Sequence, residues 1–250
     1  MADGGSKTVK TKTARPISTV LFDAGNTLLR PVPGAAEIYA EVANRYGFGR
    51  PLEEIRRHLK AALAAGMGDK LREEGSLTPE SVKLWWREFV AGVFGVTARD
   101  EKFDAFFEEL YVRFTDPDTW VVFDDVLPTL RTLREAGLRL AVVSNWDYRL
   151  PGILQAHGVS AYLDAIVVST VEGFEKPHPR LFEIALARVG SEADTALHVG
   201  DSLADDVRGA ERAGVRAILL DRGGDSSEFP GERIRSLAEL PALLGLRGAA

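Results

Sequence analysis

Four groups of polar residues follow short apolar runs, and together they supply a nucleophile candidate, a hydroxyl, an ammonium and a set of carboxylates. In chain order they are Asp23, Ser144–Asn145, Lys176 and Gly200–Asp201, the last followed by Asp205 and Asp206. In open parallel α/β sheets the carboxyl ends of the strands meet at one edge, and ligands bind there. We therefore expect these side chains to converge on one crevice.

The runs that precede these residues have the composition of buried strands. The stretch at 17–22 (ISTVLF) is apolar and β-branched, and it stops at Asp23 and the turn-forming residues AGNT. Further strands are predicted over 138–143, 165–168, 196–199 and 215–220, and helices over 126–135, 150–156, 180–189 and 202–213. This alternation predicts an α/β fold, with a Rossmann-like parallel sheet covered on both faces.

Between about Pro31 and Pro117 the pattern changes to helices only. Apolar residues recur at helical spacing in four stretches, which lie near 38–46, 52–62, 79–93 and 103–114. The chain thus divides into a disordered tail (1–15), a core (16–30 and 118–250) and an inserted four-helix bundle (31–117) after the first strand. Asp124 and Asp125, near the second junction, could face either solvent or the crevice.

Composition narrows the possible partners. The chain has 250 residues, a formal net charge of −6 and no cysteine. A mildly acidic chain lacks the basic footprint of nucleic-acid or membrane-surface binding. The absence of cysteine excludes disulfides and thiolate sites. No apolar run approaches the length of a membrane span, and the N-terminal stretch lacks a secretory apolar segment, so a cytoplasmic location is expected.

Four motifs resemble those of the haloacid dehalogenase-like hydrolase superfamily: FDAGNTLL, VVSN, EKPHPRLF and GDSLADDVRGAERAG. They occur in the right order, each at a predicted strand end, and the similarity covers roughly residues 15–225. The helical insertion resembles the four-helix cap of the branch that holds phosphoglycolate phosphatases and haloacid dehalogenases. The short runs WDYRL and GFEKPHPR further resemble the haloacid dehalogenase-like hydrolase domain-containing protein 3 subgroup.

The resemblance implies a role for each matching residue. Asp23 is the expected nucleophile on phosphorus, and Ser144, Asn145 and Lys176 are expected to bind the phosphoryl group. The expected Mg²⁺ ligands are Asp23, the carbonyl of Gly25, Asp201 and Asp206, with Asp205 as the alternative to Asp206. Such hard oxygen ligands suit Mg²⁺. The ion and the ammonium offset the repulsion between a carboxylate and a dianionic phosphate ester. The opposite charge of Lys176 should also keep Asp23 ionised.

One position departs from the family pattern. The family's phosphatases carry a second aspartate two residues after the nucleophile, as acid and base, and here that residue is Gly25. Positioned acid–base catalysis contributes about 10²–10⁴-fold in rate. The favoured hypothesis is a phosphatase of a small phosphorylated molecule with a slow or borrowed acid–base step, taken from water, from Arg57 or His58 of the insertion, or eased by a good leaving group.

Two other hypotheses remain open. The chain could bind a phosphorylated ligand or a partner without turnover, or it could be a dehalogenase, because halide departs without a proton. The sequence does not separate a monomer from a homodimer.

Overall fold

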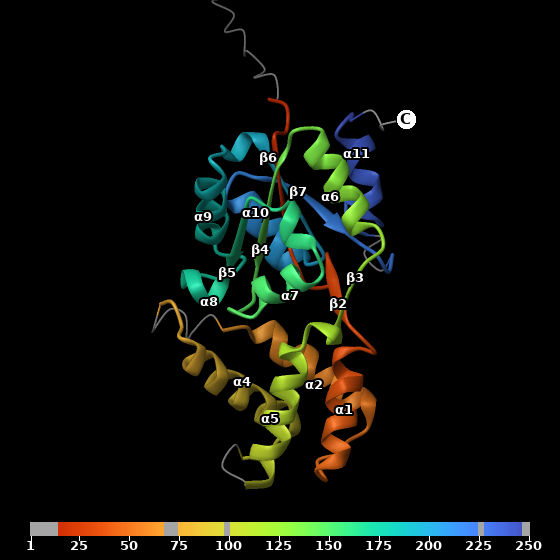
Figure 1. The fold of residues 1–250 in the computed structure, drawn as a ribbon, viewed down its shortest axis with the longest axis vertical. Helices are drawn as coiled ribbons and strands as arrows, with labels where there is room; N and C mark the ends of the chain where they lie inside the picture. Colours follow the sequence, from red (N-terminus) through yellow and green to blue (C-terminus); the bar gives the residue numbers. More distant parts are fainter. Residues whose placement is uncertain (1–14, 68–74, 98–100, 225–227, 247–250) are drawn as a thin grey trace, which may run out of the picture.

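The computed structural model describes residues 15–67, 75–97, 101–224 and 228–246, so the predicted tail at 1–15 lies almost wholly outside the described residues. Its centre is a six-stranded parallel sheet in the order β5-β4-β1-β6-β7-β8 (Figure 1). The strands are β1 (Thr19–Phe22), β4 (Arg139–Ser144), β5 (Ala165–Val168), β6 (Ala196–Gly200), β7 (Arg216–Leu220) and β8 (Arg233–Ile234). The predicted Rossmann-like α/β fold is confirmed, with β1 at the middle of the sheet.

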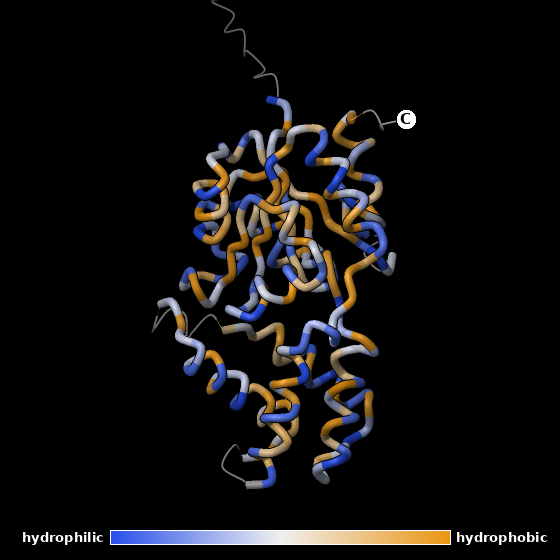
Figure 2. The backbone as a smooth tube through the Cα atoms, in the orientation of Figure 1, coloured by the Kyte–Doolittle hydropathy of each residue, from blue (hydrophilic) through white to orange (hydrophobic). Residues whose placement is uncertain are grey.

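Helices cover both faces of this sheet. The α-helices of the core are α6 (Val126–Glu135), α7 (Leu150–Ala156), α8 (Ser169–Glu172), α9 (Pro179–Val189), α10 (Arg208–Arg212) and α11 (Leu240–Leu243). Val20 and Phe22 pack on the side of α6 and α7, whereas Leu21 packs against α9 on the other side. Alternate residues of a strand point to opposite faces, so one apolar run fills two cores. In Figure 2, which colours the chain by residue hydropathy, hydrophobic residues are concentrated inside the core.

The inserted segment forms a separate helical lobe beside the core (Figure 1), made in its described part of α1 (Ala35–Arg45), α2 (Leu52–Ala65), α4 (Pro79–Phe94) and α5 (Glu101–Thr115). Its own core includes Ile38, Phe94 and Phe106, which are almost fully buried. The Thr78 side chain caps α4, Pro79 occupies its first turn, and Gly95 ends it in the left-handed conformation. The predicted helical insertion is confirmed.

A two-stranded antiparallel sheet, which the sequence pattern did not predict, joins the two lobes. It pairs β2 (Leu29–Pro31), where the chain leaves the core, with β3 (Trp120–Val122), where the chain returns. Leu29 lies opposite Val122, and Pro31 lies opposite Trp120. These strands have only three residues each, too few to show a period. The pairing fixes the two connections side by side at the base of the helical lobe.

The segment after β6 also differs from the expected continuous helix over 202–213. It begins with a π-helical turn, η4 (Leu203–Val207), and continues as α10. Four 3₁₀ turns complete the described elements, η1 (Pro117–Thr119), η2 (Val159–Tyr162), η3 (Ala193–Thr195) and η5 (Leu237–Glu239). Among the described residues, no helix is both long enough and apolar enough to cross a membrane.

Candidate active site

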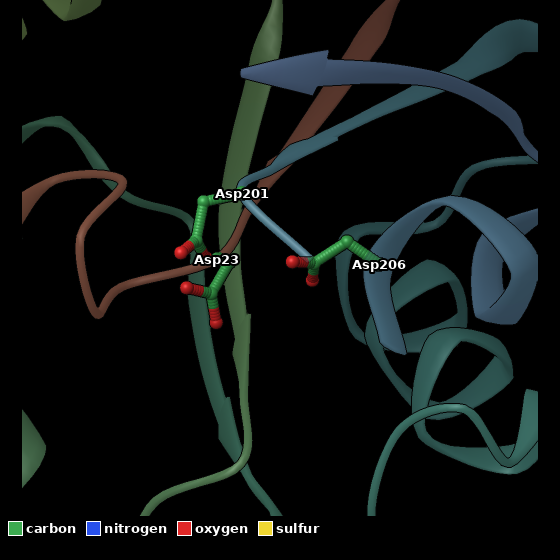
Figure 3. A group of neighbouring side chains, drawn as sticks. All are labelled: Asp23, Asp201 and Asp206. Carbon is green, nitrogen blue, oxygen red and sulfur yellow. The ribbon is translucent and has the colours of Figure 1, made fainter. Parts of the chain in front are cut away.

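Polar side chains meet at the carboxyl edge of the sheet, next to the helical lobe. Asp23 directly follows β1, Ser144 ends β4, and Asp201 directly follows β6. Oxygen atoms of Asp23, Asp201 and Asp206 all lie within 4.8 Å of one another. Figure 3 shows Asp23 and Asp201 side by side at the strand ends, with Asp206 reaching toward them from the turn after β6. The strand order therefore brings distant parts of the chain to one point.

Lys176 connects two of these carboxylates. Its Nζ donates to Oδ1 of Asp23 and to Oδ1 of Asp206, both over 2.6 Å. The Ser144 hydroxyl donates to the same Asp23 oxygen over 3.0 Å. Within the described residues, neither donor bonds to Oδ2 of Asp23, and Asp23 lines the adjoining cavity. Asp23 is thus fixed through one oxygen, while the other is left for further interactions.

The pKa values of Lys176 and Asp23 depend on burial as well as on the ion pairs between them. Burial alone would lower the pKa of Lys176, but the charges of Asp206 and Asp23 raise it above its ordinary value. Burial, with a contribution from the charge of Asp206, raises the pKa of Asp23 despite the opposing effect of Lys176. Lys176 acts on Asp23 in the expected direction, but its ammonium is shared with a second buried carboxylate, Asp206. That Asp23 is ionised in the folded protein remains a prediction.

Asp206 is the most firmly held carboxylate of the cluster. Its Oδ1 accepts from Lys176 and lies 2.9 Å from Nε2 of His198, and its Oδ2 accepts from the main-chain N–H of Ser202. Burial opposes ionisation, but Lys176 and the hydrogen bond to His198 keep the pKa of Asp206 below its usual range. A Cβ at Gly200 would lie 2.1 Å from Cγ of Asp206, so only glycine leaves room for this carboxylate.

The structure distinguishes the two neighbouring acids that the sequence left as alternatives. Asp206 joins the cluster, whereas Asp205 exchanges hydrogen bonds with Ser202 at the start of the π-helical turn. His198 of β6 belongs to the same group of side chains. It is fully buried, and the contact with Asp206 makes it a positioning residue of the cluster. Its place inside the apolar strand β6 gave no sign of that contact.

Asn145 lines the cavity, but its side chain is already engaged. Its Nδ2 donates to the carbonyl oxygen of Lys176, and its Oδ1 accepts from the Lys176 main-chain N–H. The amide therefore holds the lysine loop against the end of β4. This bracing function was not expected, and phosphate binding by Asn145 remains a prediction.

The carboxylates have the chemistry of a divalent-cation site. Three of them, from Asp23, Asp201 and Asp206, face one ammonium. Burial and the nearby charges of Asp23 and Asp206 raise the pKa of Asp201 to about 7. A hard cation among these oxygens would relieve the repulsion and restore all three anions. The donor set therefore fits Mg²⁺. The carbonyl of Gly25, a residue that lines the cavity beside Asp23, remains a predicted ligand.

A cavity of about 470 Å³ opens directly onto Asp23 and Ser144. Its walls come from both lobes, with Asn26 and Trp146 on the core side and Tyr39 and Phe107 on the helical side. Volumes of 300–1,000 Å³ are typical of small-molecule sites. The helical lobe thus closes over the polar cluster.

Three other sequence candidates lie outside this site. Asp125 accepts two hydrogen bonds from the Arg222 guanidinium, so it ties the C-terminal segment to α6. Nδ1 of His58 lies 3.0 Å from the carbonyl oxygen of Val93 inside the helical lobe. Neither His58 nor Arg57 is among the residues that line the cavity. The two residues from which an acid–base step could be borrowed are therefore not in place to supply it.

The run from Trp146 to Leu150 connects the core to the helical lobe. Asp147 is fully buried and accepts a hydrogen bond of 2.8 Å from Nε1 of Trp86 in α4. It also accepts three bonds from Arg149, whose guanidinium lies 4.4 Å from the ring centroid of Tyr111 in α5. A second connection joins Leu77 to Thr170 through main-chain atoms. These bonds hold the lobe against the carboxyl edge of the sheet.

Comparison with known proteins agrees with this architecture. The family model described as haloacid dehalogenase-like hydrolase matches residues 17–214. The chain therefore belongs to the haloacid dehalogenase-like hydrolase family. It is 32% identical to the haloacid dehalogenase-like hydrolase domain-containing protein 3 of Danio rerio, across 92% of this chain and 97% of that protein.

Two further relatives carry the name of phosphatases. The glyceraldehyde 3-phosphate phosphatase of Methanopyrus kandleri is 39% identical, across 83% of this chain and 85% of that protein. The crystal structure of a HAD phosphatase from Thermococcus onnurineus is 28% identical with a TM-score of 0.64, across 92% of this chain and 98% of that one.

Proposed function

We propose that this protein is a Mg²⁺-dependent phosphatase that cleaves a small phosphate monoester through an aspartyl-phosphate on Asp23. The observation that carries the proposal is that Lys176 bonds to both Asp23 and Asp206, and that Asp23 lines a cavity large enough for a small ester. Two relatives named as phosphatases support the reaction class. The acidic cluster favours phosphate over a haloacid, because the departure of halide requires no metal.

The metal would be held by Asp23 and Asp201, with the carbonyl of Gly25 and the carboxylate of Asp206 completing or orienting the set. When bound, it supplies positive charge that offsets the repulsion between a carboxylate and a dianionic ester. Asp206 already accepts three hydrogen bonds, so it is better suited to holding Lys176 and the metal-side turn in place.

Each side chain of the site has its own role in the proposed reaction. Asp23 attacks phosphorus through a carboxylate oxygen as the ester P–O bond breaks, and water later cleaves the aspartyl-phosphate. Lys176 and the hydroxyl of Ser144 bind phosphoryl oxygens beside Asp23, and they stabilise the charge on these oxygens in the transition state. Asn145 and Asp206 keep Lys176 at the correct position. We further propose that residues 31–117 act as a cap that excludes bulk water and selects the substrate.

The first experiment measures hydrolysis of p-nitrophenyl phosphate by the purified protein with and without Mg²⁺. We expect turnover that depends on Mg²⁺ and is abolished by Asp23→Asn, a variant of nearly the same shape. Lys60→Met is the control and should retain full activity, because Lys60 is exposed on α2 and lies outside the cavity lining.

Two outcomes would replace this proposal. Release of chloride from L-2-chloropropionate without metal would identify a dehalogenase. Metal-dependent binding of beryllofluoride, without turnover of any ester in a broad metabolite panel, would identify a non-catalytic phospho-ligand-binding protein.

A further inference from the structure

The cavity that opens onto Asp23 is lined in large part by aromatic rings. We call it the aromatic chamber, and six of its lining residues are Tyr39, Trp86, Phe107, Tyr111, Phe114 and Trp146. Five of these six belong to the cap helices α1, α4 and α5, and Trp146 belongs to the core. A ligand whose phosphoryl group lies against Asp23 must place the rest of the molecule among these rings. Flat apolar groups gain most from such walls.

The chamber is poor in available charge. Among the described residues that line the cavity, the cations are Arg30 and Arg149. Arg149 is neutralised by buried Asp147 and covered by Tyr111. Arg30 is exposed, and its guanidinium lies 5.8 Å from the ring centroid of Phe123, a residue outside the cavity lining. A second anionic group on the substrate would therefore have only the exposed Arg30 as a counter-ion among the described lining residues, and among the aromatic rings it would enter an apolar space at a desolvation cost.

The cavity also lacks an acid that could protonate a leaving alkoxide. Among its described lining residues, Asp23 is the only one with a carboxyl or imidazole group. Burial raises the pKa of the Tyr39 and Tyr111 hydroxyls above their ordinary value, so both are weak acids. Position 25 is glycine. The departing oxygen must accept the bonding electron pair unaided, which favours a phenol, with a pKa of about 10, over a much less acidic aliphatic alcohol.

We propose that the substrates are aryl phosphates, the monophosphate esters of phenol-like compounds whose ring occupies the aromatic chamber. This inference rests on the proposed phosphatase function. An Asp23 oxygen bonds to phosphorus as the P–O(aryl) bond breaks, and the aryloxide leaves with the electron pair. Water then attacks phosphorus and the Asp23–phosphorus bond breaks. The hydroxyl of that water stays on the phosphate, and its proton neutralises the aryloxide through solvent.

The test compares three esters at saturating Mg²⁺: phenyl phosphate, benzyl phosphate and phosphoglycolate. Benzyl phosphate keeps the ring but places a methylene before the leaving oxygen, and phosphoglycolate carries a carboxylate and no ring. We expect kcat/KM for phenyl phosphate to exceed that for benzyl phosphate by at least about 100-fold, the lower end of the value of a positioned acid. Phosphoglycolate should have the lowest kcat/KM of the three esters.

A pair of cap variants tests the chamber itself. Leu63 is 53% exposed and lines the cavity, whereas Leu84 is 62% exposed and lies outside its lining. Leu63→Arg adds a cation at the chamber wall and should raise the kcat/KM of phosphoglycolate relative to phenyl phosphate at least fivefold. Leu84→Arg should leave the ratio unchanged. Both sites are exposed, so both variants should fold, and circular dichroism checks this.

The possible results distinguish a failure of the aryl preference from a failure of the phosphatase function. One result would overturn the aryl specificity and leave the phosphatase function standing. In it, Asp23→Asn abolishes hydrolysis, but the kcat/KM of benzyl phosphate or phosphoglycolate equals that of phenyl phosphate. A preference for phosphoglycolate that Arg30→Met removes would likewise overturn it, because Arg30 would then be the carboxylate receptor. No turnover of any ester would overturn both.

Discussion

Lys176 and Asp206 form a buried ion pair, with Nζ and Oδ1 2.6 Å apart and each side chain only 2% exposed. The same ammonium reaches Asp23 at an equal distance. Truncating one partner of such a buried pair leaves an uncompensated charge, which is more costly than the pair itself is favourable. Lys176 is therefore needed both for the proposed chemistry and for the stability of the sheet edge.

Lys176→Met should abolish phosphatase activity and lower the free energy of unfolding by about 3–5 kcal/mol in metal-free buffer. Urea titration followed by circular dichroism measures the stability. The matched control is Lys83→Met, which breaks an exposed pair with Glu108 and should change stability by less than about 1 kcal/mol. Equal stability of the two variants would show that the carboxylates tolerate the loss of the ammonium.

The pKa of Asp201, raised to about 7, predicts how the metal-free protein responds to pH. The folded state holds this proton more tightly than the unfolded state does, so the contribution to stability is complete below about pH 4 and is lost as pH rises through 7. Asp201→Asn should therefore make the metal-free protein more stable at pH 8 and should bring no gain at pH 4. Thermal unfolding in chelator measures both values.

Metal binding should show the matching dependence. Because Mg²⁺ requires the ionised carboxylate, its apparent affinity for the wild-type protein should increase from pH 6 to pH 8. Titration calorimetry at the two pH values tests this. An affinity that does not change with pH would exclude Asp201 as the titrating ligand.

Gly25→Asp should increase turnover of benzyl phosphate at least several-fold, because it adds an acid beside Asp23. A Cβ at position 25 would lie 3.5 Å from Cζ3 of Trp146, which is an ordinary contact, although the indole crowds the space beyond it. The double variant that combines Gly25→Asp with Trp146→Ala should turn over benzyl phosphate faster than Gly25→Asp alone. Gly25→Asn has the same shape without the acid and should gain nothing. If Gly25→Asp and Gly25→Asn change the turnover of benzyl phosphate equally, the effect comes from the shape of the side chain and not from its acidity.

Trp86→Phe removes the hydrogen bond from the cap to buried Asp147 and leaves the ring packing in place. A hydrogen bond to a charged group contributes about 1.5–3 kcal/mol, so the cap should open more readily and KM should rise about tenfold or more. Trp85→Phe alters the neighbouring ring, which does not line the cavity, and serves as the control. Steady-state kinetics together with limited proteolysis of the cap measures both effects. A KM unchanged from wild type would show that Trp86 does not hold the cap.

The local pattern of the sequence predicted much of the architecture. Apolar runs that end at Asp23, Ser144 and Asp201 indicated parallel strands and the edge where their ends meet. Thr78–Pro79 marked the start of a cap helix, α4. These signals are local, because strand composition and helix caps depend on neighbours within a few residues. They are strong enough to place the polar groups on one edge.

The tertiary structure decided how these groups act. Neighbouring side chains of a helical turn point in different directions, so only one of Asp205 and Asp206 can face the strand ends. The packing of the π-helical turn against β6 selects Asp206. In the same way, His198 and Asn145 acquire their positioning contacts from segments 8 and 31 residues away.

The sequence by itself determined that one acid, one hydroxyl and one lysine leave separate strands at the same sheet edge, beneath an inserted helical lobe. Only the tertiary structure decided which carboxylates share the lysine and that the cavity wall above them is aromatic. The physical reason is that a strand end fixes where a side chain starts, whereas its charge state and partners depend on burial and on segments brought close by folding.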